Sequence, residues 1–200
     1  MNTHNIERQN DQLDQKDEQI KKYLSLYDQH DEAPYLSPDR DLDTWLKDVE
    51  IGSSSLVPKR NMVRLEEGIL PGHLILLWRI SFSTFTNESG FPKYFEYTYG
   101  INPAQALEEV LEKHYAKEMS AVASLTYLNT AQLKALLKEK NATGYTTLTK
   151  GQLMVRVKRA YLEDELETLF HVRGYTLTSI GLSLLGKYPE IIDKHPKKKF

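Results

Sequence analysis

Between residues 101 and 117, apolar side chains recur every three to four positions, the spacing of one face of an amphipathic helix. Asn102 is a suitable N-cap for this helix, and Pro103 would occupy its first position. Its inner face would consist of Leu107, Val110, Leu111 and either His114 or Tyr115. We therefore expect this helix to belong to a helical body at residues 62–124.

The same body contains a short apolar run and a group of aromatic residues. The run at residues 74–80 predicts either a buried helix or a strand, and a polar loop at residues 82–90 follows. The aromatic residues are Phe91, Tyr94, Phe95, Tyr97 and Tyr99. Their spacing is typical of one buried face of a short helix. The alternative is a platform on which nucleic-acid bases stack.

Residues 125–168 contain the pattern of two further helices. The first is capped by Asn129 or Thr130, and its apolar positions are Leu133, Leu136 and Leu137. A loop with Gly144 leads to Thr149, which together with Gln152 forms the capping-box pattern of a helix start. In the second helix the inward positions are Leu153, Val157, Ala160 and Tyr161.

The N-terminal segment, residues 1–32, is acidic and polar and predicts a solvated helix or a partly disordered arm. A seven-residue repeat would allow weak dimerisation through Ile6, Leu13, Ile20 and Tyr27. The opposite half of that seam is mostly polar, at Gln9, Lys16 and Tyr23, whereas a coiled coil needs apolar residues at both positions. We expect the end of this arm to dock on the body through Leu24, Leu26 and Tyr27.

Two less regular regions complete the chain. Residues 33–61 are interpreted as a linker with one short helix at residues 41–49. Residues 169–200 predict a short strand or turn, a helix opened by Thr178 and ended by Pro189, and a basic tail. The fold class is therefore expected to be mainly α with a small β element.

The composition excludes several kinds of chemistry. The chain of 200 residues has no cysteine, which rules out disulfides, thiol nucleophiles and thiolate zinc sites. No two of the six histidines lie three to five positions apart, and no glycine-rich phosphate loop is present. Three glutamates at positions 108, 109 and 112 are explained more simply by a solvated helix face than by a nuclease metal site. We therefore expect a binding protein without catalytic residues, bound metal or cofactor.

The sequence also predicts where in the cell the protein is found. The N-terminus has no apolar signal segment, and no apolar run approaches the length of about 18 residues that a membrane helix needs. Together with the lack of cysteine, this favours the cytoplasm and gives no sign of a membrane partner.

Charge is distributed unevenly, although the formal net charge is only −2. Residues 1–50 carry 13 acidic and 6 basic side chains, whereas residues 121–200 carry 7 acidic and 13 basic ones. Such asymmetry is a sign of nucleic-acid or membrane contact at the basic end.

The helix pair at about residues 125–160 resembles the SAP module, a helix–extended–helix unit. The residues that carry the resemblance are Leu128, Thr130, Leu133, Lys134, Leu137, Lys138, Lys150, Leu153 and Arg156. The loop is about two residues longer than is usual in that family, and Thr149-Lys150 stands where the family has Gly-Lys. The resemblance implies binding to DNA phosphates through helix starts and nearby cations. The nucleic-acid-binding residues would be Thr130, Lys134, Lys138, Thr149, Lys150, Arg156, Lys158 and Arg159.

Two other patterns add to this resemblance. The segment from Phe91 to Pro103, followed by an amphipathic helix and then the SAP-like pair, resembles uncharacterised proteins of Gram-positive bacteria and their phages. The segment Tyr175 to Leu185 resembles the wing-to-helix part of small bacterial winged-helix regulators. The alternative function is a phage-type interaction or inhibitor protein that binds a partner protein through its acidic N-terminal arm or helical body. The helix pair would then pack against the rest of the chain or serve a protein partner.

Overall fold

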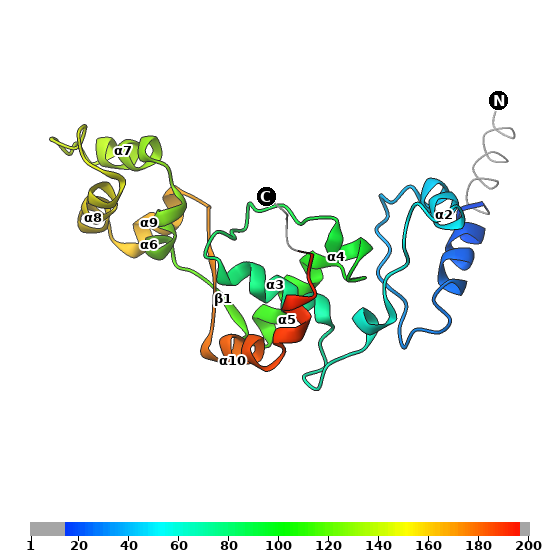
Figure 1. Cartoon of the computed structure of the whole chain (residues 1–200). Coiled ribbons are helices and arrows are strands. Elements are labelled where there is room, and N and C mark those ends of the chain that lie inside the picture. The colour runs from blue at the N-terminus through cyan, green and yellow to red at the C-terminus, as the bar shows by residue number, and fades with distance from the viewer. Residues whose placement is uncertain (1–14, 197–200) are drawn as a thin grey trace, which may run out of the picture. The chain divides into compact units, whose positions relative to one another are not determined.

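The computed structural model describes residues 15–196 (Figure 1). The fold is mainly α-helical with one two-stranded antiparallel sheet, which confirms the expected fold class. The chain forms two compact units. The described part of the first comprises residues 15–75 and 91–107, and that of the second comprises residues 76–90 and 108–196.

The first unit begins with a helix at residues 15–25 that packs beside the next one. Its further elements, in chain order, are α2 (Leu42–Glu50), η1 (Lys59–Met62), the start of α3 (Pro71–Ser81), α4 (Tyr94–Tyr97) and the start of α5 (Pro103–Glu112). Asp41 caps α2 as its side chain accepts a hydrogen bond from the Thr44 amide at 3.0 Å. Ile6, Gln9 and Leu13 of the heptad pattern lie outside the described residues.

Aromatic residues form much of the core of the first unit. Tyr23 and Phe95 have no exposed surface, and Tyr99 is 4 % exposed. The Tyr23 and Trp45 rings lie 5.4 Å apart and join the first helix to α2. Tyr23 and Tyr27 anchor that helix, while Leu24, expected to dock, is 45 % exposed.

The second unit contains the end of α3, the end of α5 and all later elements. These are β1 (Ala116–Glu118), α6 (Ala121–Ser124), η2 (Leu125–Tyr127), α7 (Thr130–Glu139), α8 (Lys150–Ala160), α9 (Glu163–Leu169), β2 (Tyr175–Leu177), α10 (Ser179–Lys187) and α11 (Pro189–Asp193). The helix expected to run to residue 117 ends at Glu112, because the chain reverses at His114, whose φ is 56°, and enters β1. The run at residues 74–80 is helical and lies within α3.

The small sheet connects segments that are distant in the sequence. β1 pairs with β2 in antiparallel register, with Ala116 opposite Leu177 and Glu118 opposite Tyr175. β2 leads directly into α10, which Thr178 caps by accepting a hydrogen bond from the Gly181 amide at 3.1 Å. α10 passes so close to the strand that a Cβ at Gly181 would lie 1.9 Å from the Tyr115 carbonyl oxygen.

Helices α6 to α9 lie together within the second unit (Figure 1). They share one apolar core. Its fully buried members come from every part of this group: Ala121, Leu125, Leu133, Leu137, Leu153, Val157 and Leu166. Tyr161 closes it at the end of α8, where its hydroxyl donates to the Leu136 carbonyl at 2.6 Å. The predicted helix pair is thus part of a four-helix group.

No helix among residues 15–196 combines the length and the apolar character needed to cross a membrane.

Candidate nucleic-acid interface

Both helices of the pair start with a complete capping box. At α7 the Asn129 side chain accepts from the Gln132 amide at 2.9 Å, and the Gln132 side chain accepts from the Asn129 amide at 2.8 Å. Asn129 is therefore the cap, and Thr130 is the first helical residue. At α8, Thr149 and Gln152 make the same reciprocal bonds, as the sequence predicts.

The loop between the helices is held by two of the predicted DNA-binding cations. The Lys134 ammonium donates to the Thr146 carbonyl at 2.6 Å. The Arg156 guanidinium donates to the Gly144 carbonyl at 3.0 Å. Gly144 has a φ of 68°, a conformation that glycine adopts without strain. In this structure, therefore, the two side chains support the loop backbone.

Lys150 brings the starts of the two helices together. It is the first residue of α8, and its ammonium donates to the Thr126 carbonyl at 2.7 Å. Thr126 precedes the first residue of α7 by four positions. The N-termini of α7 and α8 consequently lie at the same end of the pair, and the positive ends of the two helix dipoles are neighbours.

Four backbone amides at this end of the pair have no acceptor among the described residues. Within the described part of the chain, no hydrogen bond is donated by the amides of Thr130, Ala131, Lys150 and Gly151. All four residues are exposed, and a Cβ at Gly151 would meet nothing within 4 Å. Unpaired amides at the start of a helix are donors suited to a phosphate group.

The remaining predicted cations are exposed. Lys138, Lys158 and Arg159 make no hydrogen bond or ion pair with any residue in the described range 15–196. Beside Arg159 an open groove of about 690 Å³ runs along α8. Its lining includes Gly151, Val155, Arg156 and Arg159, and Val155 is 50 % exposed. The groove thus leads from the unpaired amides at the start of α8 to the cations near its end.

The helix pair is mostly basic, and an acidic helix follows it in the chain. Residues 125–161 contain seven basic side chains and one acidic side chain, Glu139. The following helix, α9, is acidic in its first turn. Glu165 in this turn forms an ion pair of 2.5 Å with Lys140, which lies at the C-terminal end of α7. The Lys140 ammonium and the Leu162 amide hold the pKa of Glu165 below its usual range. The acidic first turn of α9 therefore lies at the end of the pair opposite the unpaired amides.

Helix α9 is one of the elements that the sequence pattern does not reveal. It has only seven residues, and its apolar positions are Leu166 and Leu169. Its glutamates and aspartate in the first turn are favourable at a helix start. These three consecutive acidic residues were the sequence feature that could have indicated the start of this helix.

The aromatic cluster does not form a stacking surface. Phe95 and Tyr99 are buried, and Phe91, Tyr94 and Tyr97 are half-buried. Burial raises the pKa of Tyr99 to about 12. The cluster therefore belongs to the core of the first unit, as its spacing indicates.

In the described part of the chain, no three His, Asp or Glu side chains are placed to hold a metal ion together. Comparison with protein-family models, with curated proteins and with solved structures found no match to this chain.

Proposed function

We propose that this chain binds DNA through its phosphates, with the α7–α8 pair as the contact surface and without strong sequence preference. The observation that carries the proposal is the end of the pair at which Thr130, Ala131, Lys150 and Gly151 present unpaired amides. A phosphate at this position would receive amide donors and the positive ends of two helix dipoles.

The cations around these amides fit the same role. Lys134, Lys150 and Arg156 donate to exposed carbonyls, and such surface contacts are weak enough to be exchanged for a phosphate. Lys138, Lys158 and Arg159 would add further charge along the helices. Contacts of this kind position a protein on nucleic acid but do not read its sequence.

We further propose a role as a binding protein, not an enzyme, in the cytoplasm of a Gram-positive bacterium or its phage. This rests on the absence of cysteine and on the resemblance of residues 91–103 and 125–160 to such proteins.

The test is fluorescence anisotropy with a labelled duplex over a series of salt concentrations. We expect binding at about 50 mM salt that weakens steeply as salt rises. A triple variant, Lys138→Gln, Lys158→Gln and Arg159→Gln, should reduce the slope of log affinity against log salt. The loss should be about 0.9 for each phosphate contact removed.

The matched control removes the same charge elsewhere, through Lys93→Gln, Lys113→Gln and Lys117→Gln. These lysines are exposed and lie outside the α7–α8 pair. We expect this variant to keep most of the slope. Absence of binding by the folded wild-type chain at low salt, or equal losses in the two variants, would overturn the proposal.

A further inference from the structure

The groove along α8 has an apolar floor that contacts with phosphates would leave unused. Its volume of about 690 Å³ is within the range of about 300–1,000 Å³ that is typical of ligand sites. Gly151 and Ala160, both in its lining, are nine positions apart on α8, or about 13 Å along the helix axis. This length matches two to three turns of a second helix lying beside α8. The apolar side chains of the lining are Leu137, Ala142, Val155 and Ala160.

The floor of the groove is supported by the core of helices α6 to α9. Leu137 is a buried member of that core, and Ala142 and Ala160 pack against it. Val155, by contrast, is 50 % exposed in the middle of α8. The Ala142 amide donates to the Leu137 carbonyl at 3.0 Å, which fixes the chain where it leaves α7. A ligand therefore meets a preorganised surface, which reduces the entropy lost on binding.

The charged side chains in the lining are both basic, namely Arg156 and Arg159. The Arg156 guanidinium donates to the Gly144 carbonyl, a neutral acceptor that does not balance its positive charge. Arg159 makes no hydrogen bond or ion pair with any other residue of the described part of the chain. The groove is therefore positively charged and complements an anionic partner.

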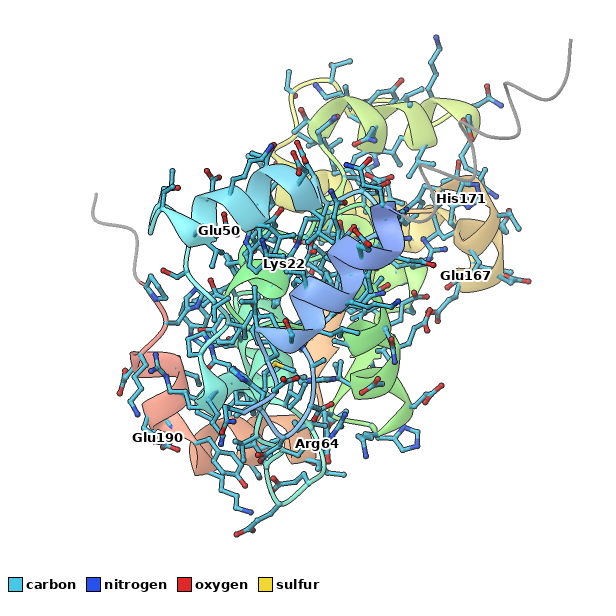
Figure 2. All side chains as sticks on the ribbon, turned by 90° about the vertical axis from the view of Figure 1, so that its right-hand side faces the viewer. Lys22, Glu50, Arg64, Glu167, His171 and Glu190 are labelled. Carbon is cyan, nitrogen blue, oxygen red and sulfur yellow. The ribbon has the colours of Figure 1, made fainter. Side chains whose placement is uncertain are left out.

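The acidic residues that follow α8 do not neutralise this groove. Glu165 pairs with Lys140, and both line a separate hollow beside Tyr161. Glu167, labelled in Figure 2, forms an ion pair of 2.6 Å with Arg173. The charges of these two carboxylates are thus balanced elsewhere in the second unit.

The chemistry of the floor favours one kind of anion. Among the described residues that line the groove none is aromatic, so it offers no ring on which a nucleic-acid base could stack. An aliphatic floor beside cations instead complements an amphipathic helix that carries leucine on one face and acidic residues beside it. Such a helix presents its apolar side chains every three to four positions.

From the aliphatic floor and the arginines without a counter-charge, we propose that this groove binds an acidic, leucine-rich helical segment of a partner protein. Leucine side chains would contact Val155 and the floor, and glutamate or aspartate side chains would contact Arg156 and Arg159. Because both arginines are also proposed DNA contacts, the segment would compete with DNA. That consequence rests on the proposed function, whereas the binding of the segment does not.

The chain's own residues 1–14 fit this description less well. They carry three acidic side chains and one arginine, but their apolar residues Ile6 and Leu13 are seven positions apart. Between them, Gln9 and Asn10 are polar where an apolar helix face needs further contacts. A segment of another protein is therefore the better occupant.

The experiment measures binding of a labelled peptide to the full chain by fluorescence anisotropy. The peptide has leucine at every third or fourth position and glutamate and alanine between. Two peptides of the same length and spacing serve as probe controls, one with lysine in place of glutamate and one with serine in place of leucine. We expect each control to bind at least about tenfold more weakly, because each lacks one half of the complementarity.

Variants then locate the site. Val155→Ser should weaken peptide binding about tenfold, and the two residues have similar helix propensities. Its control is Ile180→Ser on α10, which alters a side chain that is 55 % exposed and outside the groove and should change binding less than about twofold. Arg159→Gln should weaken binding about threefold. Lys113→Gln, which removes an exposed charge outside the groove, is the control for that change.

Val155→Ser also separates this proposal from the proposed function. It leaves every cation of α7 and α8 in place, so the affinity for duplex DNA should change less than about twofold. The peptide measurement needs no DNA. Absence of duplex binding would therefore overturn the proposed function alone, and absence of peptide binding would overturn the present proposal alone.

Further results would also overturn the proposal. Equal binding of the leucine–glutamate peptide and either control peptide, or equal effects of Val155→Ser and Ile180→Ser, would remove the groove from the contact. An equal loss of duplex and peptide affinity in Val155→Ser would assign the groove to DNA. Tighter binding of a synthetic peptide of residues 1–14 would assign it to the chain's own segment, and a wild-type dimer that Val155→Ser converts to a monomer would assign it to a second copy.

Discussion

The Arg40 side chain, only 1 % exposed, donates from Nε to the carboxylate of Glu96 at 2.7 Å. The same carboxylate oxygen accepts a hydrogen bond from the Ser37 amide at 2.9 Å. One glutamate on α4 thereby holds both the arginine and the chain that leads into α2. Removing it would leave a buried cation without a counter-charge.

We predict that Glu96→Ala lowers the free energy of unfolding by about 3 kcal/mol, since breaking a buried pair strands the remaining charge. The comparison is Glu50→Ala, which removes the partner of Lys22 in a pair whose side chains are 52 % and 57 % exposed. That change should cost at most about 0.5 kcal/mol. Urea unfolding of the two variants measures the difference, and equal losses would contradict this role of Glu96.

Two glycines of α10 should respond in opposite directions to alanine. At Gly181 a Cβ would lie 1.9 Å from the Tyr115 carbonyl oxygen, so Gly181→Ala should destabilise the chain by about 3 kcal/mol. At Gly186 a Cβ meets nothing within 4 Å, and Gly186→Ala should stabilise it by about 0.5 kcal/mol. Thermal unfolding of both variants checks the signs, and a stable Gly181→Ala would show that α10 can move from the strand.

The amide of Thr130 can be tested separately from its side chain. Proline is tolerated at the first position of a helix, where it removes only an unpaired amide, and Asn129 before it is extended. Under the proposed function, Thr130→Pro should weaken DNA binding about tenfold, the loss of one charge-assisted hydrogen bond. Thr130→Ala keeps the amide and should bind as the wild type does. Similar affinities for the two variants would exclude this amide from the contact.

Acid should destabilise the second unit through His195. Burial lowers the pKa of this imidazole, whose ring meets Trp78 edge-on with the ring centres 5.4 Å apart. The unfolded chain therefore binds a proton at His195 more readily than the folded chain. The contribution to stability is complete above about pH 6.5 and is lost as the pH falls through the lowered folded-state pKa.

Urea unfolding between about pH 8 and pH 5 measures this effect. His195→Gln should show a smaller decline in unfolding free energy over the range than the wild type. An identical decline would mean that other groups are responsible.

Local patterns were enough to predict many of the elements. The caps at Thr149 and Thr178 and the apolar positions of α7 and α8 are confirmed, because capping and helical periodicity act within one or two turns. The end of α5 could not be predicted in this way. It depends on β1 pairing with β2, some sixty residues further along the chain.

Some features of the candidate interface could likewise be predicted from local sequence patterns, and others could not. The sequence identified the helix pair and its cations, and the capping boxes implied unpaired amides next to each cap. It could not show that the two helix starts share one end, or that Lys134, Lys150 and Arg156 contact carbonyls of the chain itself. The Lys134 and Arg156 contacts depend on how the loop between the helices folds, and the Lys150 contact depends on how α8 packs beside the segment that precedes α7.

The sequence by itself determined a mainly helical, cysteine-free chain with an acidic beginning and a basic end, because composition, periodicity and caps are local properties. Only the tertiary structure decided which aromatic residues are buried, where α5 stops and which cations remain exposed. It also revealed the groove along α8, whose walls come from residues 137–142 and 151–160. The reason is physical: burial, strand pairing and grooves arise from contacts between segments that no local pattern relates.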